Sequence, residues 1–115
     1  MNEVTKLYEN AGVVLIEETE NGACCKNPFT AEKQIELIKL ISKVTLADYF
    51  QFFFYEIKEE WVFRLFVITE MSCESVYTYE SRNKDFTEAL AGLINSLWQD
   101  LTDTEKVQIK EILNE

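Results

Sequence analysis

Two runs of aromatic and β-branched residues in the middle of the chain limit the folds open to it. They span residues 49–57 and 61–70, and only Lys58, Glu59 and Glu60 separate them. Residues of these types favour strands, and a connection this short suits antiparallel neighbours. The sequence therefore predicts a β-hairpin at the centre of the fold.

Each predicted strand is apolar on both of its faces. Successive side chains of a strand point to opposite sides of the sheet. In the first run the two sides consist of Phe50, Phe52 and Phe54 and of Tyr49, Phe53, Tyr55 and Ile57. The second run has apolar residues on both sides as well. A sheet of this kind needs cover on both faces, so we expect helices on each.

The rest of the pattern predicts one α+β domain over residues 1–115. A third strand over residues 74–80 follows a link at 71–73, which gives a three-stranded antiparallel meander in the simplest topology. Residues 13–16 form a fourth short strand or an extended segment on the core, and 17–28 form a loop. Apolar spacing and capping residues predict helices over residues 3–11, 30–44, 85–101 and 102–113.

Capping residues mark the ends of these helices. Gly12 follows the first helix, where a left-handed C-terminal cap is favoured. Asp85 with Glu88, and Thr102 with Glu105, are signatures of capping boxes, in which two side chains each accept the other residue's backbone amide. These signatures fix where the last two helices begin.

The composition is strongly acidic. The chain has 21 acidic and 11 basic residues, which gives a net charge of −10. Direct nucleic-acid binding and binding to anionic membranes are disfavoured, because both need clustered Lys and Arg. The longest apolar runs fall far short of the roughly 18 residues that span a bilayer, and the N-terminus lacks a signal-peptide pattern. We expect a cytoplasmic protein.

Residues that carry common chemistry are scarce. The chain has no histidine, which removes the commonest general base and metal ligand, and its three glycines cannot form a phosphate-binding loop. Cys24 and Cys25 are adjacent and lack the spacing of a structural zinc site, so we interpret them as reduced thiols. Cys73 is interpreted as a core or turn residue. We expect no catalytic site, no cofactor and no metal.

Two features of the strands have a structural interpretation and a functional one. Arg64 lies mid-strand among apolar residues, and we predict an ion pair with Glu56 or Glu70 across the sheet. Four aromatic residues are predicted in the core, with an interface hot spot as the alternative. They are Trp61, Tyr77, Tyr79 and Trp98.

Three segments give the chain a resemblance. MNEVTKLYENAGV, NPFTAEKQIELIKLI and DFTEALAGLINSLWQDLTDTEKVQIKEIL resemble short uncharacterised proteins of bacteriophages and prophages of Gram-positive bacteria. The resemblance rests on capping and amphipathic stretches and implies no functional residue. The chain lacks the cysteine-rich insertion of some relatives and keeps only Cys24 and Cys25. The resemblance implies a small accessory protein in the cytoplasm of a bacterial host, where such proteins often bind host machinery.

We therefore expect a non-enzymatic phage or prophage accessory protein that binds a host protein. In a sharper form of this hypothesis, spaced carboxylates imitate nucleic-acid phosphates, as in anti-CRISPR and other anti-defence proteins. The acidic residues predicted to contact the partner are Glu17, Glu18, Glu20, Glu56, Glu59, Glu60, Glu70, Glu74 and Glu80.

Two other classes of function stay open. One is a structural or assembly protein that self-associates, for example as a homodimer, through an edge strand or the apolar face of the last helix. The other is a small-ligand-binding or catalytic domain that uses the aromatic sheet and the carboxylates, and it predicts a concave polar pocket.

Overall fold

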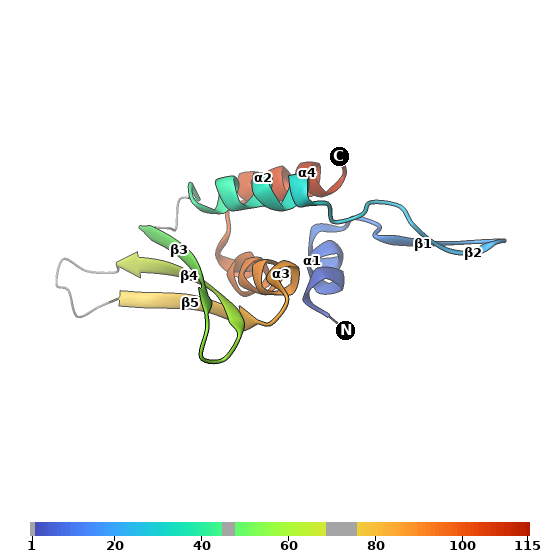
Figure 1. Cartoon of the computed structure of the whole chain (residues 1–115). Helices are drawn as coiled ribbons and strands as arrows, with labels where there is room; N and C mark the ends of the chain where they lie inside the picture. The colour runs from blue at the N-terminus through green and yellow to red at the C-terminus, as the bar shows by residue number, and fades with distance from the viewer. Residues whose placement is uncertain (1, 45–47, 69–75) are drawn as a thin grey trace.

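The computed structural model describes residues 2–44, 48–68 and 76–115 and has an α+β fold (Figure 1). Within these residues it contains four α-helices and two antiparallel sheets. In chain order the elements are α1 (Glu3–Ala11), β1 (Ile16–Thr19), β2 (Gly22–Cys25), α2 (Ala31–Ile41), β3 (Tyr49–Tyr55), β4 (Glu60–Ile68), β5 (Val76–Asn83), α3 (Phe86–Leu97), the short 3-10 helix η1 (Trp98–Asp100) and α4 (Asp103–Leu113). The predicted α+β class is confirmed.

The larger sheet contains β3, β4 and β5 in that order, and neighbouring strands are antiparallel. The predicted hairpin between β3 and β4 forms, but its turn occupies residues 56–59. Tyr55 pairs with Glu60, so Ile57 lies in the turn and is 82% exposed. Glu59 closes the turn with a φ of +52°, a left-handed conformation uncommon outside glycine. The third strand, predicted to end at 80, continues to Asn83.

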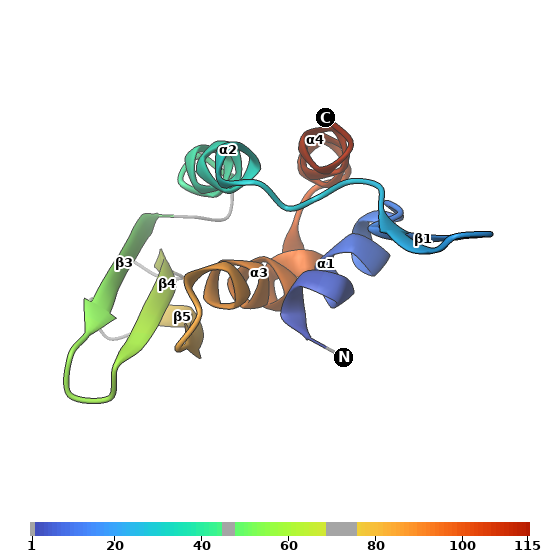
Figure 2. The ribbon, with the colours of Figure 1, turned by 45° about the vertical axis from the view of Figure 1, so that its right-hand side comes forward.

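One face of this sheet packs against α3 and forms the core. Phe63 and Leu65 of β4 have no exposed surface, and they join a cluster with the buried face of α3. The buried α3 residues are Ala89, Leu90, Ala91, Leu93, Ile94 and Leu97. In Figure 2, α3 lies between the sheet and α1. The helices α2 and α4 lie next to each other above α3. The opposite face of the sheet has no helix over it in the described part of the chain, so the expected cover on both faces is not confirmed.

Local capping is as predicted at three helix ends. Gly12 adopts φ +71° after α1, and its amide donates to the carbonyls of Tyr8 and Glu9. Thr30 caps α2. Thr102 and Glu105 form the complete capping box of α4. These contacts lie within four residues of each other in the chain, so the sequence alone specifies them.

The predicted capping box of α3 is wrong in one half. Asp85 does cap the helix and accepts from the amides of Thr87 and Glu88. The Glu88 carboxylate does not return to Asp85, whose amide donates to Asn83 Oδ1 at 2.9 Å. Instead, Glu88 accepts from the backbone amide of Glu3 at 2.7 Å. A tertiary partner has replaced the local one.

The small sheet is a hairpin that we call the arm, residues 16–25. It lies where a loop was predicted. Of the two alternatives for residues 13–16, the strand is present only at Ile16, while Val13 lies in the core cluster and Leu15 packs against it, as expected for a segment on the core. Ile16 pairs with Cys25 and Thr19 with Gly22. Every arm strand residue is exposed, and the arm projects beside α1 (Figure 1). Because the arm buries nothing, its sequence carries no apolar alternation.

Candidate functional site: the open face of the sheet

The face of the sheet opposite α3 holds the candidate site, and we call it the open face. Strand alternation and register place together Gln51, Phe53 and Tyr55 of β3, Val62, Arg64 and Phe66 of β4, and Thr78, Glu80 and Arg82 of β5. Val62, paired with Phe53 and with Arg82, has no exposed surface although it lies outside the core cluster. Side chains of the sheet itself therefore cover it.

Both arginines of the chain lie on this face and share one carboxylate. Arg64 donates through Nε to Glu80 Oε2 at 2.6 Å, and Arg82 donates through Nε to Glu80 Oε1 at 2.6 Å. The hydrogen bond from Arg82, followed by that from Arg64, holds the pKa of Glu80 below its usual value. The bridge forms because Arg64 lies directly opposite Glu80 in the register.

This bridge gives Arg64 a partner that was not predicted. The ion pair was expected with Glu56 or Glu70, and the alternative with Glu70 stays a prediction. Glu56 lies in the hairpin turn and, among the described residues, Arg64 pairs with Glu80. Glu70 lies outside the described residues. The sequence indicated that an arginine at this position needs a carboxylate, but only the register shows which one.

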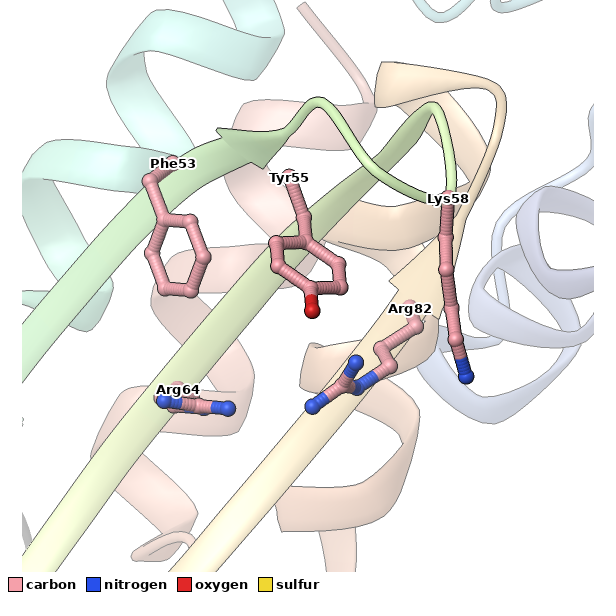
Figure 3. Close-up of a pocket in the computed structure, with 5 residues that line it drawn as sticks. All are labelled: Phe53, Tyr55, Lys58, Arg64 and Arg82. Atoms are coloured by element: carbon pink, nitrogen blue, oxygen red, sulfur yellow. The ribbon is translucent and has the colours of Figure 1, made fainter.

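An aromatic ring lies beside each guanidinium. The Cζ atom of Arg64 is 5.3 Å from the centroid of the Phe53 ring, and that of Arg82 is 5.9 Å from the centroid of the Tyr55 ring (Figure 3). These distances are within the range of cation–π attraction. Each arginine is thus held by a carboxylate on one side and a ring on another, which keeps its position well defined.

A pocket of about 320 Å³ opens on this face. Its lining residues are Phe53, Tyr55, Lys58, Arg64 and Arg82 (Figure 3). All its charged lining residues are cationic, in a chain whose net charge is −10. The hydrogen bonds that both arginines donate to Glu80 use Nε. Glu80 therefore does not occupy the Nη donors of either arginine, and the pocket is suited to an anionic group.

The predicted acidic contacts do not gather on one face. Glu17, Glu18 and Glu20 lie on the arm, and Glu56, Glu59 and Glu60 lie at the β3–β4 turn. Figures 1 and 2 show these two groups in separate parts of the molecule. Glu80 is engaged by the two arginines, while Glu70 and Glu74 lie outside the described residues. Their predicted contact with a partner stays a prediction.

The aromatic residues singled out from the sequence are mainly in the core. Tyr79 is 9% exposed and its hydroxyl donates to Asp100. The half-buried ring of Trp61 meets that of Phe86 edge to face, with 5.0 Å between centroids. Trp98 is half-buried. The side chain of Tyr77 lies outside the described part of the structure.

The cysteines and carboxylates give no metal centre in what the structure describes. Cys24 and Cys25 are free, exposed thiols on β2 rather than in a loop, and Cys73 lies outside the described residues. Across residues 2–44, 48–68 and 76–115, no group of three or more Cys, Asp or Glu side chains could hold an ion. No helix in the same residues is long and apolar enough to cross a membrane.

Neither Lys58 nor Arg82 was predicted from the sequence as a site residue. Arg82 was missed because the third strand was predicted to end at Glu80, which left Arg82 outside the sheet. The signal that could have found it is the alternation itself: on a longer strand, Glu80 and Arg82 share a face. Lys58 was assigned to the turn and not to a surface.

The fold and the open face together define an α+β protein with a cationic and aromatic pocket on a three-stranded sheet. No protein-family model matches the chain. A search of curated proteins and a search of solved structures likewise find no match.

Proposed function

We propose that this chain is a non-enzymatic phage or prophage accessory protein that binds a host protein through the open face of its sheet. One observation carries the proposal. A face that the sequence predicts to be covered is left without a described helix, and it holds both arginines beside aromatic rings. The partner would cover the aromatic residues of this face, Phe53, Tyr55 and Phe66.

The composition of the open face favours a protein partner. Arginine and tyrosine are enriched among the residues that contribute most to binding in protein interfaces. Arg64 and Arg82 are already held by Glu80 and by neighbouring rings. Less side-chain entropy is then lost on binding, which improves affinity for a given contact. The resemblance to phage and prophage proteins supports the cellular setting.

The form of the hypothesis based on nucleic-acid mimicry has less support. It requires carboxylates arranged along one surface, and the described acidic residues divide between the arm and the β3–β4 turn. We therefore propose the open face as the contact and treat the acidic arm as its rival. The two surfaces can be changed independently, because the arm packs no buried residue.

Quantitative affinity capture from a nuclease-treated lysate of a Gram-positive host tests the proposal. The open-face variant carries Lys58→Glu and Arg82→Gln. The matched control carries Lys110→Glu and Lys39→Gln, which change the net charge equally at exposed helix positions. We expect the wild type and the control to enrich the same host protein, and the open-face variant to lose it while its circular dichroism is unchanged.

A third variant examines the rival surface. Glu17→Lys with Glu18→Lys reverses charge on the arm alone. Loss of the host protein with this variant, and retention with the open-face variant, would contradict the proposal. Light scattering of the purified protein tests the self-association alternative, since a dimer that dissociates only in the open-face variant would assign the face to a second copy.

A further inference from the structure

We infer that the pocket on the open face binds a carboxylate side chain, Asp or Glu, on an acidic segment of the partner protein. This inference rests on the proposed function and names the chemistry of the partner at the same site. The residues that would hold the carboxylate are Arg64, Arg82 and Lys58, with Phe53 and Tyr55 as walls.

The fold itself shows which anion the two arginines accept. Glu80 places one oxygen on each guanidinium, both at 2.6 Å, at the short limit of charge-assisted hydrogen bonds. Each bond uses Nε. A guanidinium has five N–H donors in one plane, so the Nη groups of Arg64 and Arg82 can take a second carboxylate beside the first.

The charge around the pocket favours a singly charged guest. Lys58, Arg64 and Arg82 supply three positive charges on the lining. Glu80 offsets part of this charge, and Glu56, Glu59 and Glu60 lie in or directly beside the turn that carries Lys58. These acidic neighbours repel a phosphate dianion more strongly than a single carboxylate.

The walls and size of the pocket fit a side chain of a protein segment. Phe53 and Tyr55 present aromatic surface next to the donors, which an apolar neighbour of the acidic residue can contact. A volume of about 320 Å³ has room for one acidic side chain and part of an apolar neighbour. The segment would lie across the sheet with its acidic residue pointing into the pocket.

The small number of arginines makes a direct test possible. The protein has two arginines, so its NMR spectrum has two arginine Nε–Hε signals and both report on this pocket. The probe is a blocked peptide with one glutamate flanked by leucines. Its glutamine counterpart is the matched control, and inorganic phosphate at equal ionic strength is the third addition.

We expect the glutamate peptide to shift both signals saturably, the glutamine peptide to leave them in place, and phosphate to act more weakly. Arg82→Lys keeps the charge but loses the planar fork, and should weaken the glutamate peptide about fivefold. Equal shifts from the glutamine peptide, stronger binding of phosphate, or no shift at all would each overturn the inference.

These outcomes separate the inference from the proposed function. Host-protein capture that depends on the open face, without any effect of the glutamate peptide, would leave the proposed function standing and refute the carboxylate site. A specific peptide shift, with capture that is insensitive to the open-face variant, would support the carboxylate site and contradict the proposed function.

Discussion

Glu88 of α3 accepts a hydrogen bond from the backbone amide of Glu3 at the start of α1, with 2.7 Å between the amide nitrogen and Oε2. The first amides of a helix have no acceptor within the helix. A carboxylate at this end also interacts favourably with the helix dipole. Asn2 supplies the local cap of α1, so Glu88 adds a second, tertiary one.

The first prediction concerns this contact. Glu88→Ala should lower the free energy of unfolding by about 1–2 kcal/mol, because it removes a charged acceptor from a partly buried amide. Glu88→Gln keeps an oxygen acceptor and should lose less. Urea unfolding followed by circular dichroism measures both.

Glu111→Ala, at an exposed position on α4, is the control and should stay within about 0.5 kcal/mol of the wild type. An Ala variant as stable as the wild type would show that the amide is equally well satisfied by water.

Glu88 also illustrates what could be predicted from the sequence. Helix starts depend on contacts within one turn, so Thr102 with Glu105 was predicted correctly. The carboxylate of Glu88 has two competing donors, the local amide of Asp85 and the distant amide of Glu3, and the distant one wins. No local pattern reports that competition.

The open face was predictable in part for the same reason. Alternation along each strand correctly separates Phe53 from its neighbours on the other face, because it is a property of one strand. The partner of Arg64 depends on the register between β4 and β5, which follows from turn lengths and packing. The arm was missed because its strands bury no side chain, and apolar periodicity records only burial.

The second prediction concerns the contact of α3 with β5. A Cβ added at Gly92 would lie 2.5 Å from Ser81 Oγ, so glycine permits this close approach. Alanine is otherwise favoured over glycine inside a helix by about 1 kcal/mol. In the wild type, Gly92→Ala should yield less than this gain, because Ser81 must change its rotamer.

A double-mutant cycle measures this coupling. With Ser81→Ala in the background, Gly92→Ala should recover most of the gain of about 1 kcal/mol. Urea unfolding of the four proteins gives the coupling free energy. Additive effects within error would mean that Ser81 does not oppose the new methyl group.

The third prediction concerns the hydroxyl of Tyr8. The residue is 1% exposed, and among the described residues its hydroxyl has no hydrogen-bond partner. Burying such a group without a partner costs free energy. Tyr8→Phe should therefore raise the free energy of unfolding by about 1 kcal/mol, as measured by urea denaturation. A loss of stability would show that the hydroxyl is bonded, for instance to ordered water.

The same residue predicts a distinct response to alkaline pH. Burial, followed by the charge of Cys25, raises the pKa of Tyr8 from 10.0 to about 12. Between these values the unfolded chain releases a proton that the folded protein keeps, so stability is intact below pH 10 and falls as pH rises towards 12. This part of the loss of stability at alkaline pH should be absent in Tyr8→Phe. Identical curves for the two proteins would contradict the raised pKa.

The last prediction concerns the carboxylate that joins the two arginines of the open face. Hydrogen bonds from Arg82 and then Arg64 lower the pKa of Glu80 from its usual 4.5. A lowered pKa means that the pairing stabilises the fold above pH 4.5 and that this contribution is lost as pH falls through the value in the folded protein. The effect should be small, because side chains of this bridge are about one-third exposed and water screens them.

Glu80→Gln removes the charge at every pH. The difference in unfolding free energy between wild type and variant should therefore be largest near neutral pH and should fall towards zero under acid conditions. A difference that stays constant across the pH range would mean that Glu80 stabilises the fold through packing alone. The positions of the two guanidiniums would then not depend on its charge.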